Sequence, residues 1–325
     1  MTPSGSEFPP AAGARILSLG GYQPGNVVTN DDLAAQVETN DEWIRSRVGI
    51  VSRRFAGPEE TVTDMAFEAG AKALAGGGLS PGDVDLVIVA TCSTEALIPN
   101  VSAVVAHRLG IVAPGAYDLN AACAGFCYAM ANASDAIRAG TARHVLVIGS
   151  EKMTAWVDPT DRSTSIIFAD GAGAAVVGPV ADGEPPGIGP VAWGSAGDMA
   201  DKIIIADRNS FLQQEGQAVF RWTTTAMHPI AAQACERAGV AVSELSAFVP
   251  HQANLRIIEA IARKLGAPQA LVATDIINSG NTSSASIPLA LSAMIERGEV
   301  GSGSPVLLLG FGAGISYAAQ VITVP

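Results

Sequence analysis

Charged side chains are scarce in this sequence. Only 15% of its 325 residues are Asp, Glu, Lys or Arg and 5% are aromatic, whereas 48% are hydrophobic. Disordered chains have the opposite balance, so the composition predicts a compact globular protein that is long enough for two domains. The formal net charge is −12, which argues against nonspecific binding to nucleic acid.

Cysteine is also rare, and long uninterrupted apolar helices are absent. The four cysteines show no C-x-x-C spacing, which excludes a disulfide framework or a zinc site, and we expect no metal or redox cofactor. The opening residues M-T-P-S-G-S-E-F-P-P lack the cationic and apolar regions of a signal peptide. Residues 300–325 carry no charge, but their glycines predict two short strands around a turn, with no membrane insertion. We therefore expect a soluble, cytoplasmic protein.

Apolar runs alternate with alanine-rich segments along the chain. Residues 85–90 (D-L-V-I-V-A) and 144–149 (H-V-L-V-I-G) predict strands that are buried on both faces. Residues 30–37, 63–75 and 100–109 have helical patterns. The fold class that follows is α/β.

The second half of the chain repeats the first. D-L-V-I-V-A at residue 85 matches S-A-F-V-P-H at residue 246, and the strand ending at Gly149 matches P-V-L-L-L-G ending at Gly310. D-G-A-G-A-A-V-V also has an echo in F-G-A-G-I-S-Y-A. The helix that ends at Gly140 matches one that ends at Gly298, an alignment that sets Cys123 opposite Asn281. The repeat predicts two equivalent halves, residues 1–180 with the cysteine and residues 181–325 with a histidine and an asparagine.

Cys123 lies in the stretch Y-D-L-N-A-A-C-A-G-F-C-Y-A-M, between a predicted strand and a predicted helix. The unpaired N–H groups and the dipole at a helix N-terminus should lower the pKa of a thiol, and the thiolate is the nucleophile. A single cysteine is more often a small packing residue, and this is our interpretation of Cys92, Cys127 and Cys235.

His251 is the histidine that directly follows a buried strand, at residues 245–249, and the repeat puts it at the same sheet end as Cys123. His228 instead precedes Pro229, where we expect a helix to break. Asn281 lies in N-S-G-N-T-S-S-A-S-I-P, where an asparagine alone would be read as a turn residue.

Together these side chains indicate thioester chemistry. A thiolate at Cys123 can accept an acyl group, while His251 and Asn281 can hold the carbonyl oxygen of a second thioester as it loses CO2. The N–H groups of Cys123 and Gly312 would form the oxyanion hole of the acylation step.

Several motifs strongly resemble β-ketoacyl-acyl-carrier-protein synthase III, a thiolase-like family. They are A-A-C-A-G-F, H-Q-A-N-L-R-I, S-G-N-T-S-S-A-S, G-F-G-A-G, D-E-W-I-x-x-R-x-G-I, D-P-T-D-R and A-D-G-A-G-A-A-V. They extend in the family's order from about Asp41 to the C-terminus, and the chain looks closest to actinobacterial members. The resemblance implies a five-layer αβαβα sandwich of two pseudo-duplicated halves, a homodimer, and condensation of an acyl-CoA with malonyl-acyl carrier protein that initiates fatty acid or polyketide synthesis.

The resemblance also implies roles for further residues. Trp43 and Arg162 would hold the CoA adenine between them, with Arg47 near the phosphates. The pantetheine tunnel would be lined by Phe220, Ala253 and Asn254, and Ile98 would limit the acyl pocket across the dimer. A basic patch for the acidic carrier protein would consist of Arg221, Arg256, Arg263 and Lys264. Gln217 stands where the family commonly has Asn, and residues 196–215, which should cover the tunnel mouth, fit the family poorly.

Three other functions remain open at this point. An acyltransferase of the same fold would move the acyl group from Cys123 to another acceptor, but it would not need Asn281. A non-catalytic partner subunit would be expected to have lost the nucleophile. A Cys–His hydrolase would have no use for the basic patch.

Overall fold

The computed structural model describes residues 8–325, and residues 1–7, which include most of the segment inspected for a signal peptide, lie outside the described residues. Two five-stranded sheets organise the chain. The first has the order β1 (Ala14–Tyr22), β7 (Asp170–Pro179), β6 (Val145–Lys152), β4 (Leu86–Ala90) and β5 (Gly115–Leu119). The second has the order β8 (Ala192–Ser195), β14 (Ser316–Thr323), β13 (Pro305–Gly312), β11 (Ala247–Pro250) and β12 (Leu271–Val272).

The two sheets have the same topology, strand for strand. In the first, β4 runs parallel to β5 and β6, while β7 is antiparallel to both β6 and β1. In the second, β11 runs parallel to β12 and β13, while β14 is antiparallel to both β13 and β8. This correspondence confirms that the chain contains two pseudo-duplicated halves.

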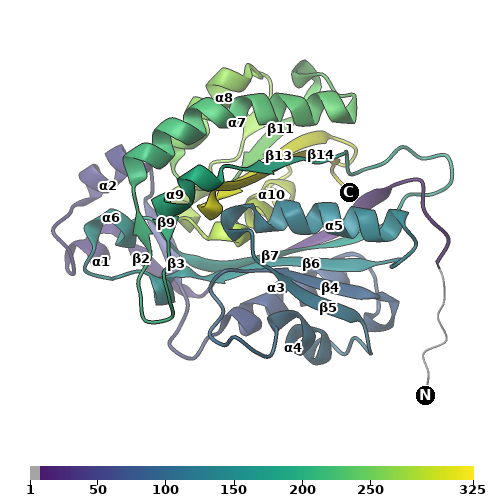
Figure 1. The fold of residues 1–325 in the computed structure, drawn as a ribbon, viewed down its shortest axis with the longest axis horizontal. Coiled ribbons are helices and arrows are strands. Elements are labelled where there is room, and N and C mark those ends of the chain that lie inside the picture. Colours follow the sequence, from purple (N-terminus) through teal and green to yellow (C-terminus); the bar gives the residue numbers. More distant parts are fainter. Residues whose placement is uncertain (1–7) are drawn as a thin grey trace.

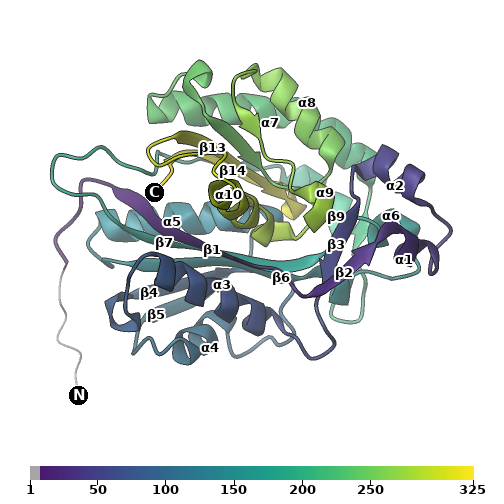
Figure 2. The ribbon, with the colours of Figure 1, turned by 180° about the vertical axis from the view of Figure 1, so that it is seen from behind.

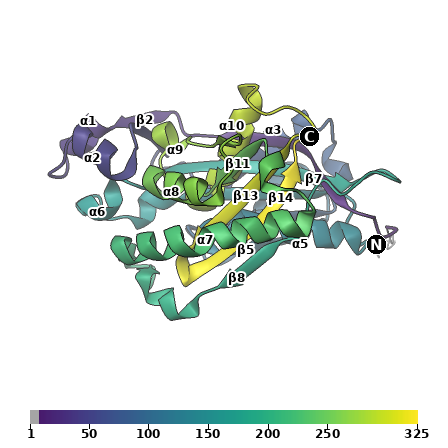
Figure 3. The same ribbon diagram turned by 90° about the horizontal axis from the view of Figure 1, so that it is seen from above.

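Helices form the other three layers of the sandwich (Figures 1 and 2). Helices α5 (Gly125–Arg138) and α10 (Ser286–Glu296) lie between the sheets and share one hydrophobic core with strands of both. The outer face of the first sheet is covered by α3 (Val62–Gly76) and α4 (Val101–Arg108). The outer face of the second is covered by α7 (Gly216–Ala238) and α8 (Leu255–Leu265), which cross over β11, β13 and β14 in Figure 3. The five-layer αβαβα sandwich is thereby confirmed.

Each central helix begins against a glycine in the opposite sheet. A Cβ atom on Gly310 of β13 would lie 2.9 Å from Ala124 Cα, just before α5, and one on Gly149 of β6 would lie 2.5 Å from Ser284 O, just before α10. Side chains do not fit at such distances, so the strand must carry glycine where the helix starts.

These crossed contacts correct the register of the repeat. Cys123 lies in the one-turn 3₁₀ helix η2 (Ala122–Ala124) before α5, and Ser284 lies in η6 (Ser283–Ala285) before α10. Ala122 and Ser283 share a left-handed conformation, with φ of 46° and 49°. Cys123 is therefore equivalent to Ser284, and the predicted equivalence with Asn281 was wrong. Our alignment used the helix ends, and α10 has 11 residues whereas α5 has 14.

Short elements gather beside the second sheet at one end of the molecule (Figure 1). They are β2 (Asn26–Thr29), α1 (Asn30–Ala34), α2 (Asp41–Val48), β3 (Ser52–Phe55), α6 (Arg162–Ser165), β9 (Ile203–Ile204), β10 (Gln213–Gln214) and α9 (Ile276–Ser279). Helix α1 ends at Ala34, earlier than the predicted 37. Among the helices of residues 8–325, none is both long enough and apolar enough to cross a membrane.

Helix α7 continues through Pro229, contrary to the predicted break. Its buried residues lie on both sides of the proline, from Val219 and Met227 to Ala231 and Cys235, and pack against the second sheet. Pro229 itself is exposed. A proline costs the helix one hydrogen bond, and the continuous apolar face outweighs that loss.

Candidate active site

The three side chains singled out from the sequence line one cavity. Its volume is about 1230 Å³, and Cys123, His251 and Asn281 all contribute to its wall together with Gly312. Cys123 follows β5, His251 follows β11, and Gly312 ends β13, so the site is built at the carboxyl ends of strands from both sheets. In α/β folds this edge is where ligands bind.

Cys123 is held by the backbone of the opposite half. A Cβ atom on Gly312 would lie only 2.6 Å from Cys123 N, so the two main chains are in contact. Burial raises the pKa of the Cys123 thiol to about 12, a hydrogen bond with Ser283 lowers it, and the Glu151 carboxylate raises it. Our prediction of a lowered thiol pKa was therefore wrong, because loss of solvent outweighs the field of the helix N-terminus. The thiol is protonated at neutral pH.

His251 is neutral, and its hydrogen bonds indicate which nitrogen carries the proton. Burial lowers the pKa of His251 to about 3. Its Nδ1 lies 2.7 Å from the Ser286 hydroxyl oxygen, which also accepts the Gln252 N–H at 3.2 Å. The Ser286 hydroxyl also has a proton to donate, and when it donates to Nδ1 the proton of the neutral ring lies on Nε2. The imidazole can then donate from Nε2.

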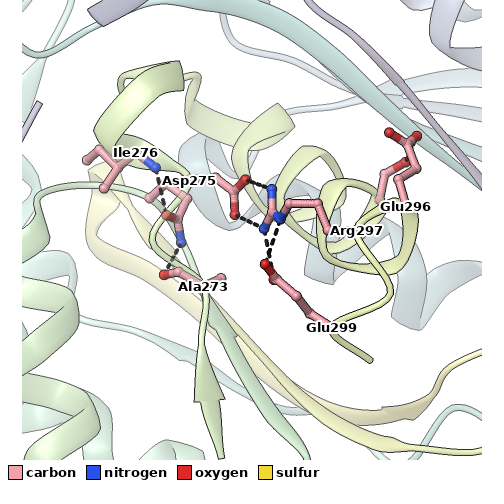
Figure 4. Close-up of polar contacts among 8 residues, drawn as sticks. Ala273, Asp275, Ile276, Glu296, Arg297 and Glu299 are labelled. Carbon is pink, nitrogen blue, oxygen red and sulfur yellow. Dashed lines mark hydrogen bonds and ion pairs between the residues drawn. The ribbon is translucent and has the colours of Figure 1, made fainter. Parts of the chain in front are cut away.

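Polar contacts hold the segment from Ala273 to Ile276 in place (Figure 4). The Gln252 side chain donates to Ala273 O at 3.2 Å and accepts from Ile276 N at 3.0 Å. Asp275, between them, pairs with Arg297 at 2.9 Å, and Arg297 also pairs with Glu299. These hydrogen bonds and ion pairs fix the chain that leads from β12 through α9 toward Asn281.

The side-chain oxygen of Asn281 already accepts a hydrogen bond. Its Oδ1 accepts the Ser283 N–H at 2.9 Å, and its main chain bonds to Ile167 O and Ala169 N. With its oxygen facing this donor, the amide has its NH₂ group left for other partners, and Asn281 is part of the cavity wall. Asn281 and His251 therefore offer two neutral N–H donors to one space.

The cavity is also lined by five of the predicted substrate-binding residues, Trp43, Arg47, Phe220, Ala253 and Asn254, and by two residues of the predicted basic patch, Arg221 and Arg256. Arg162, Ile98, Arg263 and Lys264 do not line it. The Arg162 guanidinium lies 4.8 Å from the Trp43 ring centre. A base stacked between the guanidinium and the ring needs these two groups to be about 7 Å apart, so Arg162 must move before a base can enter.

The divergent segment 196–215 lies along the cavity as a small hairpin. Ile203, Ile204 and Leu212 contribute apolar lining, and Arg208 donates to the carbonyls of Thr94 and Glu95 at 3.1 and 2.7 Å. These contacts fasten the hairpin to the loop that carries Leu97 and Ile98.

Sequence reasoning missed four residues at the site. Cys92 was interpreted as a packing residue, but it lines the cavity and contacts Glu151 and Ser283. Glu151, Ser283 and Ser286 were not singled out. The repeat contained a signal for one of them, because the 161-residue offset that pairs Gly149 with Gly310 also pairs Glu151 with Gly312.

The duplicated five-layer fold with a cysteine before a central helix defines a thiolase-like protein. A family model described as 3-oxoacyl-[acyl-carrier-protein] synthase III matches residues 117–197, and its C-terminal counterpart matches residues 235–324. A Streptomyces coelicolor protein named β-ketoacyl-[acyl-carrier-protein] synthase III 4 is 56% identical, over 96% of this chain and 99% of its own. A Mycobacterium avium relative named mycobacterial β-ketoacyl-[acyl-carrier-protein] synthase III is 47% identical, over 95% of both chains.

Solved structures agree with these relatives. The priming β-ketosynthase of the R1128 polyketide biosynthetic pathway superimposes with a TM-score of 0.94 at 43% identity, covering 99% of each chain. The 3-oxoacyl-[acyl-carrier-protein] synthase III of Aquifex aeolicus gives a TM-score of 0.91 at 39% identity, covering 96% of this chain and 100% of its own. The chain belongs to the β-ketoacyl-acyl-carrier-protein synthase III family.

The neutral state of His251 predicts a pH dependence of stability. The folded protein keeps this ring neutral down to about pH 3, whereas a histidine with the ordinary pKa of 6.5 protonates earlier in the unfolded chain. Between these values the unfolded state binds one more proton, so the residue lowers the free energy of unfolding by up to about 1.4 kcal/mol per pH unit as the pH falls.

Replacing His251→Gln should remove this contribution. Urea unfolding at about pH 6 and about pH 4.5 should show a fall in the free energy of unfolding that is about 2 kcal/mol smaller in the variant than in the wild type. An equal fall in both proteins would contradict a neutral, buried His251.

Proposed function

We propose that this chain catalyses a decarboxylating Claisen condensation between an acyl-CoA primer and malonyl-acyl carrier protein, forming a β-ketoacyl-acyl carrier protein that initiates fatty acid or polyketide synthesis. The observation that carries the proposal is the convergence of Cys123, His251 and Asn281 on one cavity. A nucleophile and two neutral donors are the groups that the two half-reactions require. Family membership supports the same reaction.

In the first half-reaction, the Cys123 sulfur attacks the carbonyl carbon of the acyl-CoA. The developing oxyanion is stabilised by main-chain N–H groups at Cys123 and Gly312, and the CoA thiolate then leaves with the proton that the cysteine lost. The thiol is protonated before substrate binds, so deprotonation accompanies attack.

In the second half-reaction, malonyl-acyl carrier protein enters the emptied tunnel. The bond between its carboxylate and C2 breaks, CO2 leaves, and the electron pair moves onto the thioester oxygen as an enolate. His251 Nε2 and Asn281 Nδ2 donate hydrogen bonds to that oxygen. The enolate carbon attacks the acyl-cysteine, and the Cys123 thiolate leaves. The thioesters supply all the electrons, and the proposal includes no metal or redox cofactor.

We also propose that the protein acts as a cytoplasmic homodimer. Edge strand β5 is unpaired on one side among residues 8–325, and Tyr117 on it is 38% exposed. Leu97 and Ile98 are 82% and 85% exposed. An unpaired edge next to exposed apolar side chains fits pairing with a second copy.

The first prediction concerns the nucleophile. With a panel of acyl-CoAs, intact-protein mass should show one acyl adduct on the wild type and none on Cys123→Ala, whereas Cys235→Ala, a buried cysteine on α7, should still be acylated. Adding malonyl-acyl carrier protein should discharge the adduct as β-ketoacyl product.

Asn281→Ala should acylate normally but lose at least about a hundredfold in CO2 release.

Other results would change the assignment. An adduct that persists on Cys123→Ala would refute the nucleophile. A wild-type adduct that malonyl-acyl carrier protein never discharges would instead favour the acyltransferase that moves the acyl group to another acceptor.

The second prediction concerns Gly312. A Cβ atom there would lie 2.6 Å from Cys123 N and 2.9 Å from Cys123 Cβ, so Gly312→Ala must displace the cysteine or the strand. We expect the rate of Cys123 acylation, followed by mass, to fall by about a hundredfold or more. Gly301→Ala is a matched control, because a Cβ atom at Gly301 would have no neighbour within 4 Å. Normal acylation of the Gly312 variant would contradict the requirement for a glycine against Cys123.

The third prediction concerns the exposed arginines and lysine of α7 and α8, which we propose as the docking patch for the carrier protein. Arg263→Glu is the cleanest test, since Arg263 is exposed and does not line the cavity. The KM for malonyl-acyl carrier protein should rise about three- to tenfold, more at low salt, while acylation by acyl-CoA is unchanged. Arg143→Glu, exposed before β6, should change neither. If Arg263→Glu and Arg143→Glu raised the KM equally, the change in net charge alone would explain both results, and the docking patch would be contradicted.

A further inference from the structure

Glu151 is a buried carboxylate that the proposed reaction does not use. It lies near the carboxyl end of β6 with no solvent exposure, and no ion pair found among residues 8–325 includes it. Desolvating a carboxylate without a cationic partner is costly, so its surroundings must compensate with hydrogen bonds. Those bonds connect two segments of the active site.

Most contacts of the two Glu151 carboxylate oxygens are divided between two segments, with Cys92 Sγ of the loop also lying 3.4 Å from Oε1. Oε2 accepts from the loop after β4, at 3.2 Å from Thr91 Oγ1, 3.1 Å from Cys92 N and 2.5 Å from Ser93 Oγ. Oε1 contacts the turn η6, at 3.0 Å from Ser283 Oγ and 2.8 Å from Ser284 Oγ. The loop carries cavity residues Thr91 and Cys92, and the turn begins two residues after Asn281.

Ser283 transmits this anchoring to Asn281. Its hydroxyl donates to Glu151, while its main-chain N–H donates to Asn281 Oδ1 at 2.9 Å. Its φ is 49°, in the left-handed region that non-glycine residues seldom adopt. The conformation that aims the N–H at Asn281 thus needs support from outside the turn, and Glu151 supplies contacts to both serines of that turn.

The duplication shows how this arrangement relates to the nucleophile. The offset that makes Ser284 equivalent to Cys123 also makes Glu151 equivalent to Gly312. In one half, Gly312 leaves its space open, so its backbone touches Cys123 N. In the other half, the Glu151 side chain fills the corresponding space, with its carboxylate 3.4 Å from Ser284 N. The end of β13 therefore contacts Cys123, whereas the equivalent end of β6 carries Glu151, whose side chain contacts the 283–284 turn.

We propose that Glu151 is a positioning residue for the decarboxylation half-reaction. By holding the 283–284 turn against the loop after β4, it fixes the Asn281 amide with its oxygen toward Ser283 and its NH₂ toward the substrate thioester oxygen. Glu151 touches no substrate atom and acts through Asn281. This inference rests on the proposed function.

The test separates the two half-reactions. Glu151→Gln keeps the size of the side chain but sets an NH₂ group against a cluster of donors, so the turn or the loop must shift. We expect CO2 release from malonyl-acyl carrier protein to fall about tenfold or more, with acylation of Cys123 by acyl-CoA retained, because a misdirected donor loses part of the hundredfold or larger effect of a deleted one. Ser284→Ala removes one contact to Glu151 together with the hydrogen bond from Ser284 to Ala90 O, and should give a smaller loss of the same kind, about threefold.

Ser150→Ala is the control for disturbance of β6. Ser150 is fully buried, adjacent to Glu151, and donates to Val62 O at 2.8 Å, away from the site. Its variant should release CO2 at the wild-type rate. A loss equal to that of Glu151→Gln would overturn the proposal in favour of a general packing effect.

A double variant gives the sharpest readout. If Glu151 acts through Asn281, Glu151→Gln combined with Asn281→Ala should release CO2 no more slowly than Asn281→Ala alone, whereas independent roles would multiply the two losses. Multiplied losses, or a wild-type rate in folded Glu151→Gln and Ser284→Ala, would overturn the inference. If Asn281→Ala itself kept the wild-type rate, the proposed function would fail instead, so the two failures are distinguishable.

Discussion

Each central helix begins in close contact with a strand of the opposite half, and the arrangement of the site depends on these contacts. Gly149 and Gly310 leave no room for a side chain where α10 and α5 begin, and Gly312 brings its backbone against Cys123. Because interiors are packed at crystal density, contacts this short fix the relative position of the elements they join. The two sheets are thus brought into register at the point where the cysteine of one half meets the histidine and asparagine of the other.

A duplicated fold provides two such points, and the chain uses them differently. At one, the small strand residue Gly312 brings its backbone against Cys123, the proposed nucleophile. At the other, Glu151 and Ser284 occupy the equivalent positions and are buried behind the cavity wall. The site has one reacting centre because the second junction has been filled with side chains that hydrogen-bond to one another.

Much of this organisation was predictable from the sequence, and the failures have physical causes. The buried strands at 85–90 and 144–149 and the reactive trio follow from local patterns, because apolar runs and strand-end polar residues leave a direct signal. The register of the repeat does not, since a three-residue difference in helix length is invisible until the backbones are superposed. The raised thiol pKa was missed because desolvation depends on what packs around Cys123, which no local pattern records. Helix α7 was missed because a proline was given more weight than the apolar face on either side of it.

The charges in the site differ before and during the reaction. His251 is neutral and the Cys123 thiol is protonated, so the resting cavity wall carries no charge at the reacting atoms. Negative charge would arise only during the reaction, first on sulfur and then on an enolate oxygen, and in a desolvated space neutral donors stabilise it strongly. A carboxylate behind the wall works against both anions, and Glu151 does raise the pKa of Cys123. Glu151 opposes the negative charge that the reaction must develop, and no cation lies beside it among the described residues. Its benefit at this position must therefore come from the segment that it holds in place. We propose that this is the turn which orients Asn281, the donor that the condensation would need and a simple acyl transfer would not.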